Sequence, residues 1–200
     1  MTFTRPRSYH HGDLRLELLQ RAEETLRESG VDGLSLRQLA RDLGVSHGAP
    51  SRHFRDKQAL LDALALAGFE RLGALFTVAS GAGSFAQRLE SVTRTYVDFA
   101  TENSALLELM FARKHSPTGG TVLPAAADKT FAIPMALIAD GQANGDVVTG
   151  DPARIGFAAF ATMQGMATLV SSGFVPADLA ETMLADVTTH ILNGLTPRTP

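Results

Sequence analysis

Apolar residues along this chain recur at steps of three and four, which is the spacing of one face of an α-helix. Segments rich in glycine, serine, proline or asparagine separate these periodic stretches, as expected for connections between helices. The pattern predicts helices over residues 12–30, 35–43, 46–54, 56–76, 85–102, 105–112, 123–143, 151–172 and 176–195. The sequence therefore predicts an all-α fold.

Several residues mark where these helices begin or break. Residues 77–84, TVASGAGS, have the composition of a linker. Asp151 is expected to cap a helix whose first residue is Pro152. We expect Pro134 to interrupt its helix, because proline lacks a backbone donor. Residues 105–112, ALLELMFA, are apolar around most of the helix and are expected to be buried.

The last two helices are apolar on most sides. Residues 151–172 are rich in small residues and carry few charges. The final helix has an apolar stripe formed by Leu179, Met183, Val187 and Ile191. Such helices in a soluble chain predict a homodimer interface, while the alternative is that they only close the core of the monomer. The interface residues that we expect are Phe157, Ala161, Met183, Val187 and Ile191.

Residues 35–54, SLRQLARDLGVSHGAPSRHF, have the pattern of two short helices joined by a tight turn. One apolar face of the first helix is formed by Leu36, Leu39, Ala40 and Leu43. Ser35 and Gln38 are spaced as a capping box. Gly44 stands where the backbone is expected to turn left-handed, and Ser46 is expected to cap the second helix.

The second of these helices has the surface of a helix that enters the DNA major groove. Its outward positions are small or polar and almost free of acids, so they neither clash with bases nor repel phosphates. Pro50 conflicts with a regular helix from His47, and a later start or a first turn of 3₁₀ type would avoid that conflict.

This segment resembles the DNA-binding domain of the TetR family of transcriptional regulators, in which an aromatic, a lysine and a fourth helix follow the helix-turn-helix. Here these are Phe54, Lys57 and a helix from Asp56. Ser51 stands where the family often has an aromatic residue that contacts a phosphate. The C-terminal part is partly similar to a type with Trp-His-Gly, where this chain has Met163-Gln164-Gly165.

The resemblance implies an N-terminal helix-turn-helix domain joined by the fourth helix to a C-terminal domain. The bounds that we expect are a flexible basic arm over 1–11, a DNA-binding domain over 12–75, and a ligand-binding and dimerisation domain over 84–195. In this family the last two helices pair with those of a second subunit into a four-helix bundle. That pairing would present two recognition helices to half-sites about one turn apart on double-stranded operator DNA.

Two sets of candidate site residues follow. The residues expected to contact DNA are Ser35, Arg37, Ser46, His47, Gly48, Ser51, Arg52, His53 and Lys57. The residues expected to line the pocket of a small-molecule effector are Phe99, Met110, Phe111, Phe131, Met135, Phe160, Met163 and Gln164. Since only Gln164 among the latter is polar, the expected effector is largely apolar. Arg5, Arg7, His10 and His11 of the arm are further candidates for DNA contact.

The composition is compatible with this interpretation. The 200 residues include no cysteine, which excludes disulfides and thiolate metal sites and fits a reducing cytoplasm. The net charge of −3 is uneven, since residues 1–58 sum to about +2 and the rest to about −5. There is no secretory signal and no run of 18 apolar residues, so no membrane segment is expected.

The chain lacks the motifs of the common enzyme classes. It has no glycine-rich phosphate loop, no HExxH and no GxSxG, so we expect neither an enzyme nor a cofactor or metal. The hypothesis is a DNA-binding repressor released from its operator by a ligand. The alternative is a helical small-molecule carrier or protein adaptor that does not bind DNA, because the basic excess of the N-terminal part is small.

Overall fold

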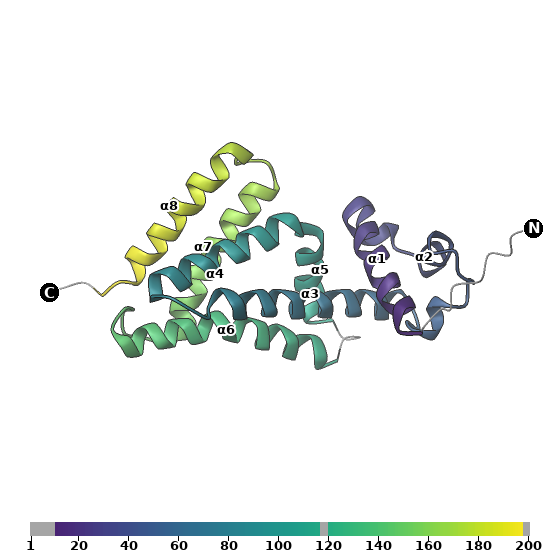
Figure 1. The fold of residues 1–200 in the computed structure, drawn as a ribbon, viewed down its shortest axis with the longest axis horizontal. Coiled ribbons are helices and arrows are strands. Elements are labelled where there is room, and N and C mark those ends of the chain that lie inside the picture. Colours follow the sequence, from purple (N-terminus) through teal and green to yellow (C-terminus); the bar gives the residue numbers. More distant parts are fainter. Residues whose placement is uncertain (1–10, 117–119, 198–200) are drawn as a thin grey trace, which may run out of the picture.

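The computed structural model describes residues 11–116 and 120–197, and this part of the chain is helical (Figure 1). The elements are α1 (His11–Gly33), α2 (Leu36–Asp42), the 3₁₀ turn η1 (Pro50–Arg52), α3 (Lys57–Ala79), α4 (Phe85–Glu102), α5 (Ser104–Lys114), α6 (Val122–Asn144), α7 (Pro152–Ser171) and α8 (Ala177–Leu195). The all-α prediction is confirmed. Residues 1–10 of the expected basic arm, with Arg5, Arg7 and His10, lie outside the described residues, while His11, expected in the arm, begins α1.

Helix α3 runs through the long axis of the molecule and belongs to both of its halves. At its N-terminal end it packs with α1, and farther along it packs with α4, α5 and α6 (Figure 1). Helices α7 and α8 lie at the other end, against α4. Because one helix is shared in this way, the domain bounds of 12–75 and 84–195 stay predictions.

The N-terminal part holds one end of a core that continues into the C-terminal helices. The predicted seam of α1 is confirmed, since Leu18, Ala22 and Leu26 are at most 2% exposed. Leu34 and Phe54 join the same cluster from the segments on either side of α2. Gly30 adopts φ 67° and kinks α1, so the regular helix ends at the glycine that was predicted to end it. One further helical turn continues to Gly33.

The connection between α3 and α4 is shorter than the predicted linker over residues 77–84. Helix α3 continues through Ala79, because Ala79 is buried against the core. Ser84 and Gln87 then form a capping box. The backbone N–H of Gln87 donates to Ser84 Oγ at 3.3 Å, and the backbone N–H of Ser84 donates to Gln87 Oε1 at 2.9 Å. The Ser-x-x-Gln spacing was a usable signal for this helix start.

Helix α6 is continuous through Pro134, so the predicted interruption is wrong. Proline removes one backbone donor, but packing on either side holds the helix together. Thr130 Oγ1 donates to the carbonyl of Phe69 in α3 at 2.9 Å, and Leu137 and Ile138 are 2% exposed. Among the described helices α6 is long and apolar enough to cross a membrane by length and composition, but its inner face is part of this core.

Candidate functional site

The turn after α2 has the geometry that the helix-turn-helix pattern predicts. Gly44 adopts φ 67°, in the left-handed region where a side chain is costly. The Val45 amide donates to the carbonyl of Ala40 at 2.9 Å, which closes the end of the helix. Leu39 and Ala40 are buried against α1, so the turn is fixed on the N-terminal core.

The segment after this turn is not a regular α-helix, which corrects the prediction for residues 46–54. The amides of Ala49 and His53 donate three residues back, to Ser46 and Pro50, both at 2.9 Å. Pro50 has no N–H to donate to Ser46 four residues back, so only the 3₁₀ turn Pro50–Arg52 forms. The N-cap of this turn is Ala49, so the predicted cap at Ser46 is wrong.

The predicted capping box at the start of α2 is also absent. Ser35 has the extended backbone of a cap residue, but its side chain makes no capping hydrogen bond. Gln38 donates instead to Asp42, which also accepts from Arg21 of α1 at 2.9 Å. The hydrogen bonds from Gln38 and Arg21 lower the pKa of the Asp42 carboxyl, and Asp42 raises the pKa of Arg21. This contact ties α2 to α1.

The candidate DNA-contact residues lie together on the outside of this region. Ser35, Arg37, Ser46, His47, Gly48, Ser51 and Arg52 are exposed, and His53 and Lys57 are half-buried. Residues 43–55 contain no acid. Within the part of the chain that the structure describes, Arg37, Arg52 and Lys57 form no salt bridge. These cations are therefore available to phosphates.

The two ends of the connection from η1 to α3 are each fixed by one contact. Asp56 accepts from the Ala59 amide at 2.8 Å and caps α3, as predicted. The guanidinium of Arg15 lies 5.4 Å from the centre of the Phe54 ring, which seats the end of the DNA-binding segment against α1. This cation–π contact was missed in the sequence and has no local signal there, because its partners are far apart in the chain.

Polar contacts join the N-terminal part to the C-terminal helices. Arg71 of α3 donates to Glu23 of α1 at 3.1 Å and to Asn103, which precedes α5, at 2.9 Å. Arg113 of α5 donates to Asp62 of α3 at 2.8 Å. Helix α5 also packs against α1. A displacement of α5 would therefore act on the two helices that support the helix-turn-helix.

The predicted effector residues fall into different places. Phe111, Phe131 and Phe160 belong to an aromatic cluster with Tyr96, in which Phe131 and Phe160 have ring centres 5.1 Å apart. A residual space of about 20 Å³ is lined by Phe131, Met135, Phe160 and Met163. Phe99 packs under Arg71, and Met110 is fully buried against Gly68. Neither of these two lines a described cavity.

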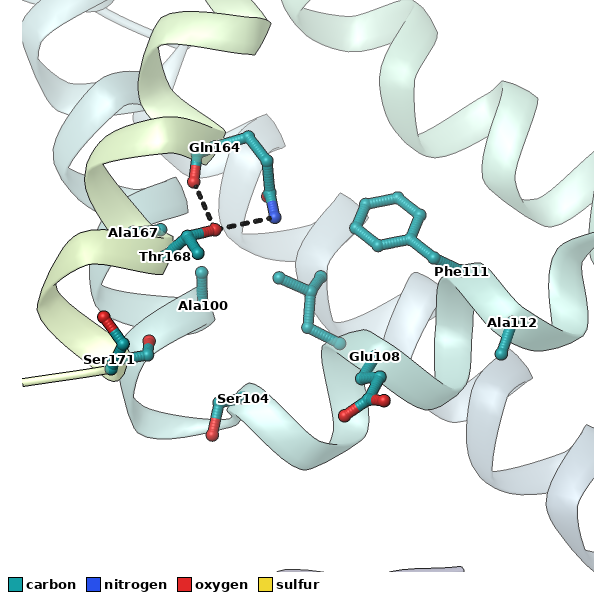
Figure 2. A pocket seen from close by; sticks show the side chains of 11 residues that line it. Ala100, Ser104, Glu108, Phe111, Ala112, Gln164, Ala167, Thr168 and Ser171 are labelled. Carbon is teal, nitrogen blue, oxygen red and sulfur yellow. Dashed lines mark hydrogen bonds between the residues drawn. The ribbon is translucent and has the colours of Figure 1, made fainter.

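A larger cavity of about 600 Å³ lies beside this cluster, between α5 and α7 (Figure 2). Phe111 and Gln164 are the predicted residues that line it. The Tyr96 hydroxyl donates to Gln164 Oε1, and burial raises the pKa of Tyr96. Glu108 of α5, on a helix expected to be buried, is exposed because it borders this cavity. The sequence signal was the helical spacing of Ser104, Glu108 and Phe111.

The candidate interface residues lie on α7 and α8 with unequal exposure. Phe157 is 68% exposed and Ala161 is exposed, while Met183 and Val187 are half-buried and Ile191 is 7% exposed. The predicted stripe of α8 is partly outward in the single chain, since Leu179 is 49% exposed. The inward residues of α8 are Leu184, Thr188, Ile191 and Leu195.

Comparison with known proteins places both halves of the chain. Residues 18–64 match the family described as bacterial regulatory proteins, tetR family, and residues 89–190 match the tetracyclin repressor-like C-terminal domain. The chain is 54% identical over 48 residues to the class A tetracycline repressor from transposon 1721 of Escherichia coli, covering 24% of this chain and 22% of that protein. It is 39% identical over 66 residues to the HTH-type transcriptional repressor Rv1474c of Mycobacterium tuberculosis, covering 33% of this chain and 35% of that repressor.

Solved structures extend the similarity to almost the whole chain. A protein of unknown function from Rhodococcus sp. RHA1 is 42% identical, with a TM-score of 0.88 over 96% of this chain and 100% of that one. The TetR-family regulator PfmR from Thermus thermophilus is 23% identical, with a TM-score of 0.71 over 90% of this chain and 99% of that one, and shares the fold. The matched domain models together span most of the chain, which therefore belongs to the TetR family of transcriptional regulators.

Proposed function

We propose that this protein is a homodimeric repressor that binds double-stranded operator DNA and releases it when a small, largely apolar effector binds. The observation that carries the proposal is the acid-free segment 43–55, which contains Arg52 and is flanked by Arg37 and Lys57. These three cations pair with no acid among the described residues. The class A tetracycline repressor and Rv1474c, which match over 48 and 66 residues, are named as repressors. The proposed location is the cytoplasm, where a bacterial operator is accessible.

The geometry supports base contacts by one set of residues and phosphate contacts by another. The exposed small and polar residues from Ser46 to Arg52 can approach base edges, because they leave room for the backbone to lie close to the groove. Arg37 and Lys57 stand on the two flanking helices and suit phosphate contacts that set the register.

The dimer part of the proposal rests on apolar side chains that α7 and α8 leave uncovered. Phe157, Leu169 and Leu179 are 68%, 39% and 49% exposed. Around Phe157 the outer face of α7 carries small residues such as Ala161 and Gly165, which allow a second helix to approach closely. A two-fold dimer through this face would present two DNA-binding segments to one operator.

The release part of the proposal rests on α5. One face of this helix borders the 600 Å³ cavity, and Arg113 near its end bonds to Asp62 of α3. In this proposal α5 has two positions, one in the DNA-bound protein and one in the released protein. A ligand that binds the released form more tightly would favour that position of α5 and so change the orientation of the DNA-binding parts. The neighbouring aromatic cluster fits a ligand that is apolar over most of its surface.

The test is fluorescence anisotropy with a labelled duplex that carries the region upstream of the gene, at two salt concentrations. The Arg52→Ala, Lys57→Ala variant is expected to bind more weakly. The slope of log affinity against log salt should fall by about 0.9 for each phosphate that the variant no longer neutralises. The control is Lys129→Ala, which removes an exposed cation of α6 and should bind as wild type.

Selective, salt-weakened binding that only the first variant loses would support the repressor. Equal binding to scrambled duplex, or equal affinity of both variants, would favour the carrier or adaptor without DNA binding.

A further inference from the structure

The cavity between α5 and α7 has a polar rim and an apolar interior. Ser104, Glu108 and Phe111 are three and four residues apart, so they share the face of α5 that borders it. Gln164 and Thr168 are likewise one turn apart on α7. Figure 2 shows Glu108 and Ser104 toward the lower side of the view, with Phe111 and Gln164 on the upper side.

Glu108 is the charged residue among those described on the lining of this cavity. The other polar lining residues are serines, a threonine and a glutamine, and none of the described residues on the lining is basic. Glu108 also has no ion-pair partner among the described residues, whereas Asp62, nearby in the fold, is paired with Arg113. An unpaired carboxylate favours a cation and repels an anion, although solvent screens part of the effect because Glu108 is exposed.

The interior continues toward the aromatic cluster through two residues. Phe111 lines the cavity and stacks on Phe131, with ring centres 6.3 Å apart. Gln164 lines it and accepts from the buried Tyr96 hydroxyl. A ligand with an aromatic or alkyl body can therefore contact Phe111 while its polar end stays at the rim.

We infer that this cavity binds a small cationic amphiphile, whose protonated amine lies against Glu108 and whose apolar body lies against Phe111 and Leu107. The inference rests on the proposed function in treating this molecule as the effector. It adds to that function the charge of the ligand and the residue that selects it. Because one wall of the site belongs to α5, occupancy acts on the helix that Arg113 joins to α3.

The test uses three probes with the same body and different ends: 4-phenylbutylamine, 4-phenylbutan-1-ol and 4-phenylbutanoate. Isothermal titration calorimetry of the full chain near pH 7.5 compares their affinities, since an alkylamine is protonated there. The amine is expected to bind most tightly. Glu108→Gln should weaken amine binding by about two- to fivefold, the usual effect of losing an exposed charged partner, and leave the alcohol unchanged.

Two further variants separate charge from general damage. Glu108→Lys should reverse the preference, so that 4-phenylbutanoate binds more tightly than the amine. Glu70→Gln removes an exposed acid of α3 that does not line the cavity, and should behave as wild type. Equal affinities of the three probes, no binding of any probe, or an amine affinity unchanged in Glu108→Gln would each overturn the inference.

The DNA assay distinguishes the failure of this inference from the failure of the proposed function. If the operator duplex is bound selectively without any probe while the amine shows no preference, the repressor stands and the cationic ligand is wrong. If the amine preference depends on Glu108 but no selective DNA binding occurs, the site stands and the protein is a carrier. If both hold, the amine should lower DNA affinity in wild type and not in Glu108→Gln.

Discussion

Replacing Phe157 with aspartate should separate the proposed dimer into monomers. Phe157 lies on the outer face of α7 and is 68% exposed in the single chain. A phenylalanine this exposed stabilises little in the monomer, so its removal leaves the protomer core intact. In a two-fold interface the same substitution appears twice, which doubles its effect on association.

The magnitude follows from the exposed area. A phenylalanine side chain has about 200 Å² of surface, so 68% exposure leaves about 130 Å² to be covered in a dimer. At about 25 cal/mol per Å² this is about 3 kcal/mol for each protomer and about 6 kcal/mol for the pair. Incomplete burial reduces that figure, and the buried carboxylates oppose association further, so we expect a loss of at least about 4 kcal/mol. The dimer dissociation constant should then rise by about a thousandfold.

Sedimentation equilibrium over a range of concentrations measures this constant directly. Val78→Asp is the matched control, because Val78 is 81% exposed and belongs to α3, which is not a helix of the proposed interface. Circular dichroism at the same concentrations should show both variants equally helical. An unchanged dissociation constant for Phe157→Asp, or an equal loss in Val78→Asp, would refute the assignment of the interface to the outer face of α7.

Two further predictions concern the protomer itself. A Cβ at Gly68 would lie 2.5 Å from Met110 Sδ, so Gly68→Ala should lower the free energy of unfolding by about 1 kcal/mol, although alanine favours helix. In a Met110→Ala background the same change should raise it by about 1 kcal/mol, and urea unfolding of the four proteins should show this reversal of sign. Hydrogen bonds from Gln38 and Arg21 lower the pKa of Asp42 in the folded protein, so this stabilisation is complete above the ordinary pKa of 3.8 and disappears as the pH falls below it. Asp42→Asn should therefore lower the melting temperature at pH 6 but not at pH 2.5, and an equal loss at both pH values would contradict this account.

Local sequence was sufficient for most helices and for their starts. The buried positions of α1 and α4 recur at helical spacing, and this recurrence reports which face meets the core. Asp56 and Asp151 cap the helices that follow them, because a cap acts over only three residues. Gly44 is in the left-handed region, as its place after an apolar face predicts.

The sequence was less informative where two local tendencies compete. Pro50 could end the second helix or start it late, and the hydrogen bonds show that only a 3₁₀ turn forms. Pro134 could break α6, but Thr130 and its neighbours are held by α3, and tertiary packing outweighs one lost hydrogen bond. Ser35 and Gln38 have the spacing of a capping box, but the Gln38 side chain has charged partners instead, since it donates to Asp42 and accepts from Arg41.

The sequence by itself determined that this protein is all-helical, that it carries a helix-turn-helix near its N-terminus, and which of its surfaces is free of acids. Those properties depend on the order of neighbouring residues. Only the tertiary structure decided where the cavity lies, because its walls come from α5 and α7, whose residues Glu108 and Gln164 are far apart in the chain. The same apolar residue type fills the core at Phe99, closes the aromatic cluster at Phe131 and remains exposed at Phe157. Periodicity reports the side of a helix that is apolar, while the neighbour that covers it is set by packing between distant segments.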